Sequence, residues 1–539
     1  MTKRIKSARN DGPMKLAGHI IGGFDMFYEE KSVEVFNPAT GKVIGKTSSL
    51  RGDELNFIEV NARKAQKHWH HEVSEQEKET VFRTIIKKIE NNRGNLVRTM
   101  VIESGKLWRW ADAEVQETID TLWHYHGEIS RNHTHDGFVR CQLPDKNAYS
   151  VRVPYGLIYG ITPWNFPLAI PFWKICGALA GDNAVVIKAA EQAPFIAYYA
   201  VKLITEAIRE TITDGRQTKL LGLVQLVQGM GETSGKLLLN NLNYDKVAFT
   251  GGAETGKIIA ETAGARLKSC HLELGGHAAM VVLDDFDIDL AVAEAINANL
   301  GDSGQRCVSA RVVFVQENKY AEFLAKYLER AKTRKVGNPM DFETEMGPLI
   351  SREQLERVGA QVHNTSQFNL KLGGYCLEFV HNDPYQTNGY YFEPTVFASL
   401  PYGTTAMDEE IFGPVIVINP LPGKSREEAF WNGVELVNQS KYGLSNALLT
   451  NDRHLASRAP WHFKTGLLYI GRGTTGAELN KYFGGVKASG WGKEGKGLEE
   501  WTQVVQVYDD YHGKARMAQA GTDEKTKKMI SESKSSLEN

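Results

Sequence analysis

The chain has 539 residues, of which 42% are hydrophobic and 24% are charged. A chain of that length is too long to fold around one ordinary hydrophobic core, so we expect a soluble globular protein with two or three domains. The formal net charge of -2 argues against binding to nucleic acid or to an acidic membrane surface.

The cysteine content and the amino-terminal segment bear on the compartment. The five cysteines are few, scattered and odd in number, which favours a reduced intracellular protein over a disulfide framework. No apolar run reaches the roughly 18 residues that a membrane-spanning helix requires. Residues 1–16 are basic but lack a continuous apolar segment, so a solvated leader is favoured over a transit peptide and a secretory signal is not indicated. We therefore expect a cytoplasmic protein.

The first distinctive element in chain order is a hairpin. Residues 138–142 and 148–153 have the pattern of two short strands, and the segment 143–147 between them contains Pro144 and Asp145. Such turn residues predict a tight connection between antiparallel strands. An ordinary surface hairpin and a strand pair that contacts another subunit remain open at this point.

From about residue 153 the chain alternates short β-branched runs with amphipathic stretches, which is typical of a parallel α/β sheet. The expected strands span residues 156–161, 184–187, 223–227, 246–249 and 271–274. A helix is expected over 195–210, because its apolar residues recur at helical spacing. A second α/β block begins at 278–283 and continues with helices over 290–300 and 319–333. The end of the chain, from about residue 518, is rich in Lys, Ser, Glu and Thr and is expected to be disordered.

Three motifs indicate chemistry. Cys307 ends the string Gly304-Gln305-Arg306-Cys307, Glu273 lies in Leu272-Glu273-Leu274-Gly275-Gly276, and Asn165 lies in Pro163-Trp164-Asn165-Phe166-Pro167. Each is ambiguous alone, because a single cysteine is more often a small buried hydrophobe than a nucleophile. A glutamate before two glycines is usually a strand end. Together the three motifs resemble the aldehyde dehydrogenase superfamily.

The resemblance covers roughly residues 20–510, with further matching strings at 103–106, 442–444 and 483–490. It implies an α/β fold with a Rossmann-like NAD-binding domain in residues 1–136 and 155–275 and an α/β catalytic domain in 276–492. It also implies a small β oligomerisation element in 137–154 and 493–514, followed by a disordered tail at 515–539. In the resembled family the hairpin pairs with a neighbouring subunit, so a homodimer or homotetramer is expected.

The expected reaction is a two-stage oxidation. The Cys307 thiolate adds to an aldehyde, and the Asn165 side-chain amide and the Cys307 backbone N–H stabilise the oxyanion, each such donor being worth about 3 kcal/mol. Loss of hydride leaves a thioester, which water activated by Glu273 hydrolyses. A free cysteine has a pKa near about 8.5, so it needs activation, for which Glu273 is the expected base. The alternative for Asn165 is an ordinary turn residue.

The cofactor motif is the string from Phe249 to Gly256, whose glycines let backbone amides and a helix amino terminus over 257–263 face a phosphate. Its spacing differs from the GxGxxG fingerprint and is similar to the family's variant, except that Gly252 replaces the usual serine. Lys188 and Glu191 match the family's ribose-binding lysine and glutamate, with Ala189 in place of a proline; a surface ion pair is the alternative. A glutamate there repels a 2′-phosphate, so NAD is expected in preference to NADP. The expected cofactor residues are Trp164, Lys188, Glu191, Gly229, Phe249, Gly251, Gly252, Thr255, Gly256, Leu274, Glu410 and Phe412. No metal is expected.

The substrate is expected to be an anionic semialdehyde derived from an amino acid. Residues 472–477 resemble the anchor loop of relatives that oxidise glutamate, succinylglutamate or aminoadipate semialdehyde. The resemblance implies that the backbone N–H groups of Gly476 and Ala477 bind the substrate carboxylate. Arg306 is expected to attract the anion, although a structural ion pair is equally open. The expected apolar collar consists of Phe166, Trp173 and Phe483, for which the alternative is an ordinary core position.

The sequence therefore predicts an NAD-dependent aldehyde dehydrogenase. A CoA-acylating or phosphate-coupled reductase on the same fold is the first alternative, and Glu273 argues against it because that chemistry needs no base to activate water. A catalytically silent structural protein is the second alternative, favoured only by the departures at Gly252 and Ala189. His277, which stands where asparagine or lysine is commoner in the family, is expected to be a packed histidine rather than a pH switch.

Overall fold

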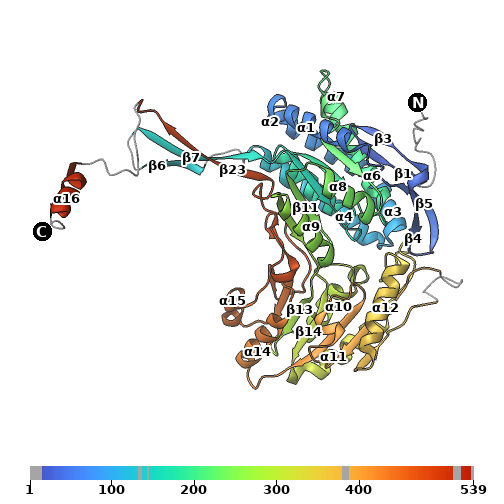
Figure 1. Ribbon diagram of the computed structural model, residues 1–539. Coiled ribbons are helices and arrows are strands. Elements are labelled where there is room, and N and C mark those ends of the chain that lie inside the picture. The colour runs from blue at the N-terminus through green and yellow to red at the C-terminus, as the bar shows by residue number, and fades with distance from the viewer. Residues whose placement is uncertain (1–14, 132–135, 142–144, 379–387, 514–523, 536–539) are drawn as a thin grey trace.

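A computed structural model of the chain describes residues 15–131, 136–141, 145–378, 388–513 and 524–535. Two α/β lobes lie next to each other, and a narrow β arm projects from the first lobe (Figure 1). Within these described ranges, no helix is long and apolar enough to cross a membrane.

The first lobe is built on an eight-stranded sheet with the order β21-β12-β11-β8-β9-β10-β2-β3. Its strands are β2 (His19–Ile21), β3 (Phe24–Met26), β8 (Leu157–Ile161), β9 (Ala184–Lys188), β10 (Val224–Val227), β11 (Lys246–Thr250), β12 (Ser269–Glu273) and β21 (Gly490–Trp491). The five strands from β12 to β10 are parallel. Their carboxyl ends therefore meet at one edge, which is where ligands bind in open α/β sheets.

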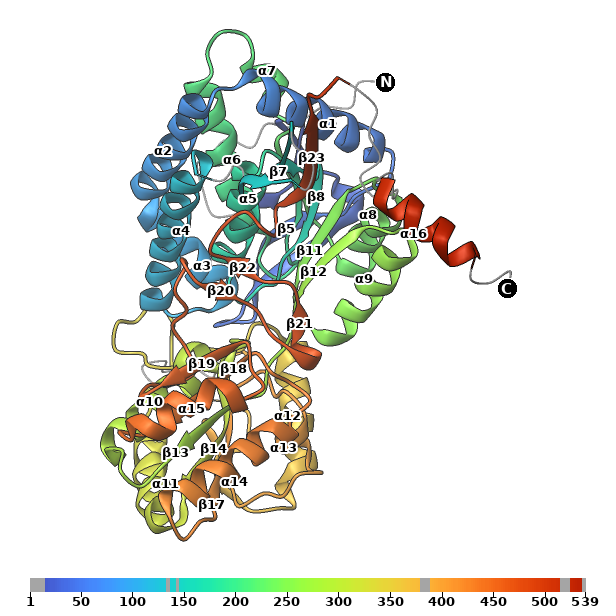
Figure 2. The same cartoon turned by 90° about the vertical axis from the view of Figure 1, so that its left-hand side faces the viewer.

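Helices cover both faces of this sheet (Figure 2). They are α1 (Leu55–Glu72), α2 (Glu75–Asn91), α3 (Arg93–Ser104), α4 (Trp108–Ile129), α5 (Ala169–Ala180), α6 (Pro194–Thr211), α7 (Gln217–Leu220), α8 (Lys236–Asn241) and α9 (Ala253–Ala265), with single turns η1 (Glu29–Lys31) and η2 (Gly231–Gly235). Strand β9 is buried along its whole length, as expected for a β-branched run in a parallel sheet covered on both sides. A small sheet of β1 (Leu16–Ala17), β5 (Lys42–Ser48) and β4 (Ser32–Asn37) packs beside α6.

The second lobe contains a seven-stranded sheet with the order β15-β16-β17-β14-β13-β18-β19. Its strands are β13 (Ala278–Val282), β14 (Ala310–Gln316), β15 (Leu370–Leu372), β16 (Thr395–Ala398), β17 (Val415–Leu421), β18 (Ser445–Leu449) and β19 (Leu467–Ile470). Its helices are α10 (Ile288–Leu300), η3 (Gly301–Gly304), α11 (Glu317–Lys332), α12 (Arg352–Ser366), α13 (Thr405–Asp408), α14 (Arg426–Gln439) and α15 (Arg453–His462). Apolar residues fill a separate buried cluster on each face of the sheet.

The arm is a three-stranded antiparallel sheet of β6 (Asp136–Arg140), β7 (Lys146–Pro154) and β23 (Thr502–Asp510). The hairpin expected over 138–142 and 148–153 corresponds to β6 and β7, and the third strand comes from the far end of the chain. Figure 1 shows the arm extending away from both lobes.

The domain boundaries expected near residue 490 differ from the structure. Residues 490–491, assigned from sequence to the catalytic domain, form β21 and pair antiparallel with β12 of the first lobe. Residues 493–501, assigned to the oligomerisation element, include Trp501, which is buried in the core of the first lobe. The free edge of β12 accounts for the first difference, because an unpaired sheet edge presents hydrogen-bonding groups that a returning segment satisfies. The same returning segment contains β20 (Tyr482–Phe483), η4 (Lys487–Ser489) and β22 (Glu494–Gly495).

The tail expected to be disordered over 515–539 contains helix α16 (Glu524–Ser535). Its sequence is dominated by residues with good helix propensity, and Lys527 pairs with Glu524 one turn away. Residues 515–523 and 536–539 lie outside the described part of the chain.

Candidate functional site

A cavity of about 800 Å³ is lined by residues of both lobes. Cys307 and Glu273 both line it, so the structure brings the predicted nucleophile and the predicted base to one space. The six residues predicted to contact substrate line the same cavity: Phe166, Trp173, Arg306, Gly476, Ala477 and Phe483.

A strained turn presents Cys307. Asp302, Ser303 and Gly304 have φ values of 54°, 55° and 71°, so three successive residues adopt the left-handed conformation that non-glycine residues rarely take. A Cβ on Gly304 would lie 2.0 Å from the Gly413 carbonyl oxygen, so only glycine fits there. The backbone therefore reverses sharply just before Cys307.

Arg311, at the start of β14, holds this turn in place through hydrogen bonds to backbone carbonyl oxygens. Its guanidinium donates to the carbonyl oxygens of Gly413, Gly304 and Arg306 at 2.9, 2.6 and 3.2 Å. The side chain is buried, and burial lowers the pKa of Arg311 to about 10. It remains charged at neutral pH, so its bonds to the three carbonyls are charge-assisted.

The Cys307 thiol is not a ready nucleophile on its own. Burial raises the pKa of Cys307 to about 12, and the negative charges of Glu410 and Glu273 act in the same direction. A thiol with so high a pKa reacts slowly unless a neighbouring base takes its proton.

Glu273 ends β12 and supplies a buried carboxyl group. The residue is 2% exposed, and among the described residues neither carboxyl oxygen has a hydrogen-bond partner. Burial raises the pKa of Glu273 to about 7, although His271 opposes the shift. A carboxyl group with a pKa near neutrality is suited to general-base catalysis at physiological pH.

Asn165 lies beside the cysteine loop, between β8 and α5. Its side-chain amide donates to the Gln305 carbonyl oxygen at 2.9 Å. An amide nitrogen has two N–H donors, so this bond leaves one for a substrate oxygen. The structure thus brings Asn165 to the segment that carries Cys307.

The predicted cofactor residues gather at the carboxyl edge of the first sheet. Lys188 ends β9, and its ammonium group pairs with Glu191 at 3.0 Å. Burial lowers the pKa of Lys188, and Glu191 opposes that shift. Gly229 follows β10 with a φ of 101°, and an added Cβ would lie 2.5 Å from the Ser234 hydroxyl.

The glycines after β11 shape the approach to α9. A Cβ on Gly251 would lie 2.5 Å from the Phe249 ring, and one on Gly256 would lie 2.5 Å from Leu274. Gly252 is the N-cap of α9, and a Cβ there meets nothing within 4 Å. The space before this helix amino terminus is therefore open, and exposed Thr255 lies in its first turn. Such a terminus fits a phosphate group, because its backbone N–H groups lack helical partners.

Glu410 and Phe412 reach this edge from the second lobe. Glu410 accepts a hydrogen bond from the Gly276 backbone N–H at 3.2 Å, and burial raises the pKa of Glu410 to about 7. The rings of Phe412 and Trp164 meet edge to face with centroids 5.4 Å apart. Both lobes therefore contribute to the predicted cofactor site.

Aromatic rings form part of the cavity wall. The Trp173 and Phe483 rings lie with centroids 5.2 Å apart. The Arg306 guanidinium lies 5.5 Å from the Phe166 ring centroid and 3.9 Å from Asp302. Its Nε atom has no hydrogen-bond partner among the described residues. The ion pair considered from sequence is therefore present but long.

The loop that ends at Gly476 and Ala477 is anchored beside Cys307. The Thr474 hydroxyl donates to the Val308 carbonyl oxygen at 2.6 Å, and the Gly473 backbone N–H donates to Glu294 at 2.7 Å. Gly476 has a φ of 99°, which favours glycine. The first of these bonds holds the loop against Val308, the residue that follows Cys307.

Sequence reasoning missed several residues of this region. Lys106 and Glu114 form a buried pair behind Asn165, and Arg311 holds the cysteine turn. Glu117 lines the cavity, and burial raises the pKa of Glu117 to about 7. His271 lies beside Glu273. A single charged or polar residue inside an apolar strand, as at Arg311 and His271, was the available signal, because buried charges need partners.

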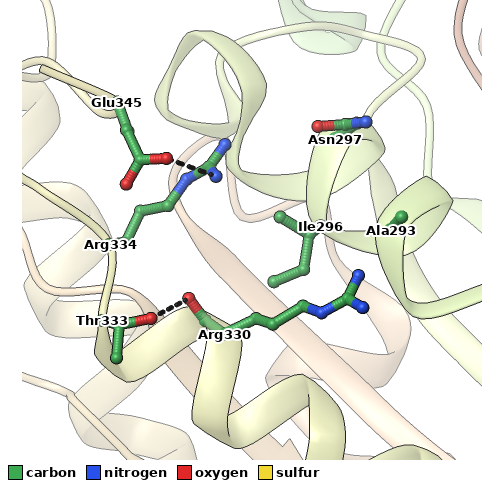
Figure 3. A pocket seen from close by; sticks show the side chains of 7 residues that line it. All are labelled: Ala293, Ile296, Asn297, Arg330, Thr333, Arg334 and Glu345. Carbon is green, nitrogen blue, oxygen red and sulfur yellow. Dashed lines mark hydrogen bonds and ion pairs between the residues drawn. The ribbon is translucent and has the colours of Figure 1, made fainter. Parts of the chain in front are cut away.

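A smaller cavity of about 250 Å³ lies between α10 and α11. Figure 3 shows its Arg334 paired with Glu345, at 3.2 Å. Arg330, the other arginine there, contacts Asp289 at 3.4 Å. Since both arginines have carboxylate partners, this cavity offers no uncompensated charge.

No cluster of His, Cys, Asp or Glu suited to a metal ion occurs in the part of the chain that the structure describes. His277 packs with its Nε2 3.1 Å from the Ala406 carbonyl oxygen, and burial lowers the pKa of His277 to about 4.

Comparison with known proteins agrees with this geometry. A family model described as the aldehyde dehydrogenase family matches residues 27–507. An aldehyde dehydrogenase from Emericella nidulans is 31% identical, over 89% of this chain and 92% of its own length. A betaine aldehyde dehydrogenase from Bacillus subtilis is 32% identical, over 89% of this chain and 94% of its own. The crystal structure of a putative aldehyde dehydrogenase from Burkholderia cenocepacia superposes with a TM-score of 0.85 at 28% identity, covering 93% of this chain and 99% of the other. The predicted fold class and the resemblance stated from sequence are confirmed.

Proposed function

The chain belongs to the aldehyde dehydrogenase family of NAD(P)-dependent enzymes, and we propose that it oxidises an aldehyde to a carboxylic acid through a thioester on Cys307. The observation that supports this route is the shared cavity of Cys307 and Glu273. One group provides a sulfur nucleophile, and the other provides a base whose pKa of about 7 suits proton transfer at neutral pH.

In the first stage Glu273 takes the proton of the Cys307 thiol, directly or through a water molecule. The thiolate adds to the carbonyl carbon, and the developing oxyanion accepts hydrogen bonds from the Asn165 amide and the Cys307 backbone N–H. Two aligned donors stabilise such an oxyanion by several kcal/mol, at about 3 kcal/mol each. When bound, the nicotinamide cofactor supplies the acceptor for the hydride.

Before the second stage Glu273 releases the proton of the thiol to solvent and is a carboxylate again. It then removes a proton from water, whose oxygen attacks the thioester carbon. The carbon–sulfur bond breaks, the carboxylic acid leaves, and Cys307 regains its thiolate. This step requires a base beside the acyl group. A CoA-acylating or phosphate-coupled reaction does not require one, and the buried Glu273 carboxyl therefore favours hydrolysis.

We infer that NAD is the preferred cofactor. The open space before Gly252 at the amino terminus of α9 fits a pyrophosphate, since nothing lies within 4 Å of an added Cβ there. The Lys188–Glu191 pair stands at the end of β9, at the same edge of the sheet, where its ammonium group donates to ribose hydroxyls and its carboxylate accepts from the ribose diol. That carboxylate disfavours the 2′-phosphate of NADP.

We propose an anionic semialdehyde derived from an amino acid as the substrate class. Arg306 is next to Cys307 in sequence, lines the cavity and is only loosely paired, at 3.9 Å from Asp302. The backbone of Gly476 and Ala477 lines the same space and offers N–H donors for a carboxylate. Phe166, Trp173 and Phe483 provide apolar walls around the carbon chain.

The proposal is tested by following NADH absorbance with NAD and a panel of aldehydes, with and without CoA or phosphate. We expect turnover without CoA or phosphate, and the highest kcat/KM with glutamate, succinylglutamate or aminoadipate semialdehyde relative to aliphatic aldehydes of equal length. Turnover only with CoA or phosphate would indicate the acyl-transfer alternative. No NADH with any aldehyde would favour a silent structural role. A preference for aliphatic aldehydes would refute the substrate class alone.

We also propose that the enzyme is a cytoplasmic homodimer or homotetramer joined through the arm. Strand β23 exposes Val504, Val505 and Tyr508, and exposed apolar side chains on a projecting sheet favour pairing with a second copy. Cys176, Cys270, Cys307 and Cys376 are free thiols, as suits a reducing compartment. Light scattering that reports a monomer at micromolar concentration would contradict the assembly.

A further inference from the structure

A cluster of buried charges lies directly behind the Glu273 carboxyl group. His271 precedes Glu273 by two residues on β12, so both side chains lie on the same face of the strand. The His271 ring is fully buried, with Nε2 3.3 Å from Glu273 Oε1 and Nδ1 3.4 Å from Glu500 Oε2. The imidazole therefore stands between the predicted base and a second carboxylate.

The other members of the cluster leave Glu273 without a lysine partner of its own. Glu494, on β22, pairs with Lys174 of α5 at 2.6 Å and lies 3.7 Å from His271 Nε2. Glu500 pairs with Lys246 of β11 at 2.8 Å. Lys493 donates its ammonium group to the Gly484 carbonyl oxygen at 2.6 Å, and Cys307 faces Glu273 from the cavity side. Lys174 and Lys246 thus pair with two of the three carboxyl groups around His271, and the imidazole lies next to the third, that of Glu273.

The ring position is fixed by the chain that returns over β12. Gly490 is paired with Glu273 and Trp491 with Leu272. Gly492 has a φ of 89°, and an added Cβ would lie 2.5 Å from His271 Nδ1. A residue without a side chain thus leaves the space that the buried imidazole fills.

The protonation state of His271 agrees with this arrangement. Burial lowers the pKa of His271, but Glu273, Glu500 and Glu494 raise it, with the net result a value of about 9. The ring is therefore an imidazolium at neutral pH. A positive charge at this distance favours the ionised form of a carboxyl group.

We propose that His271 is a positioning residue for the deacylation step: its imidazolium keeps the Glu273 carboxylate ionised and aimed at the cavity. The proposal depends on the base role of Glu273 given under the proposed function. No proton leaves His271 in the step. The proton of water passes to Glu273, the water oxygen bonds to the acyl carbon, and the sulfur leaves as a thiolate.

The test compares the wild-type enzyme with the variants His271→Gln and His271→Asn. The NADH burst and the steady-state rate are measured from pH 5.5 to 9.5 with NAD and an aldehyde that the wild-type enzyme oxidises. Both variants remove the charge but keep a polar amide. We expect a burst of unchanged amplitude and an acid limb of kcat moved to higher pH by about one unit or more, as for a carboxyl group that loses a cationic neighbour. The steady-state rate at pH 7 then falls about fivefold or more, while the rate at pH 9.5 recovers.

His277→Gln is the matched control, because His277 is also buried but faces the Ala406 carbonyl oxygen. Its acid limb should stay at the wild-type position. The proposal would be overturned by an unshifted acid limb in both His271 variants or by opposite shifts in the two, because neither outcome fits a ring that acts on Glu273. Loss of the burst would also overturn it, because the ring would then act before deacylation. Glu273→Gln tells the two proposals apart. If that variant turns over steadily, the base role itself fails; if it stalls while the His271 variants keep the wild-type profile, only the role of His271 fails.

Discussion

The ammonium group of Lys106 lies 2.6 Å from the backbone carbonyl oxygen of Asn165, with the two residues 59 positions apart in the chain. Lys106 also pairs with Glu114, whose side chain is fully buried. The same Glu114 carboxylate accepts from the backbone N–H groups of Leu168 and Ala169 at 2.8 and 3.0 Å. A buried ion pair thus fixes both ends of the segment that presents the Asn165 amide.

Replacing Lys106 with methionine should damage both stability and catalysis. The substitution leaves the Glu114 carboxylate buried without a cation, a change that typically costs about 3–5 kcal/mol of unfolding free energy. We expect this loss in urea unfolding, together with a fall in kcat, because the Asn165 segment loses its anchor. Lys326→Met, at an exposed pair with Asp289, should leave the unfolding midpoint unchanged. An equal midpoint for both variants would contradict the anchoring role.

Cys307→Ala should abolish aldehyde oxidation and leave NAD binding nearly intact. The thiol lines the aldehyde cavity, whereas the predicted phosphate contact is at the amino terminus of α9. Calorimetric titration with NAD and an NADH assay measure the two effects separately. Cys376→Ala removes an exposed thiol and should retain full activity. Loss of NAD binding in Cys307→Ala would place the sulfur in the cofactor site.

Glu273→Gln should give one burst of NADH, near one equivalent per active site but slower than in the wild type because Cys307 loses its base, and then stall, because no base remains to activate water. In the wild type, the pKa of Glu273 of about 7 sets the acid limb. Deacylation needs the carboxylate, so kcat should rise as pH increases through 7 and fall below it. Stopped-flow absorbance gives burst and steady state in one trace. Glu103→Gln, at a buried carboxyl group that accepts from the amino terminus of α6, should show no stall.

The strands and helices of the first lobe were predictable because the order of apolar and polar residues in each reflects which of its faces is buried. Strand β9 is an uninterrupted apolar and β-branched run, and helix α6 has a strong apolar face. The motifs around Cys307, Glu273 and Asn165 were likewise readable, because each is a local string. The structure then brings these distant strings to one cavity.

The supporting residues were not predictable, because their roles depend on pairing across the fold. Nothing near Lys106 in sequence indicates that its side chain reaches Asn165. Nothing near Arg311 indicates that its guanidinium donates hydrogen bonds to three backbone carbonyl oxygens. The same holds for β21, whose residues join the first sheet although they follow the second lobe in sequence. Long-range register is set by packing, which a single strand's sequence does not specify.

Arg306→Met should weaken the binding of anionic semialdehydes selectively. Methionine keeps an apolar side chain beside Trp110, whose ring lies 4.3 Å from the guanidinium carbon, but removes the charge. Loss of a hydrogen bond to a charged group corresponds to about a tenfold or greater rise in KM. Steady-state kinetics with a semialdehyde and an aliphatic aldehyde of equal length should show this rise only for the first. Equal losses for both substrates would make Arg306 a structural residue.

Gly252→Ser should tighten NAD binding. The residue is the N-cap of α9 with a φ of -72° and a ψ of 148°, a backbone conformation that serine adopts readily at this position. A side chain enters open space there, so the hydroxyl is free to donate to the pyrophosphate. A hydrogen bond to a charged acceptor is worth about 1.5 kcal/mol or more, so the Kd for NAD should fall about tenfold. Calorimetric titration measures that change. Gly252→Ala adds the Cβ without the hydroxyl and should show no gain. Gly251→Ser is the opposite case, because its Cβ would lie 2.5 Å from the Phe249 ring and displace it. If the serine and alanine variants at 252 bind NAD equally, the hydroxyl makes no phosphate contact, and the open space at this helix terminus does not face the pyrophosphate.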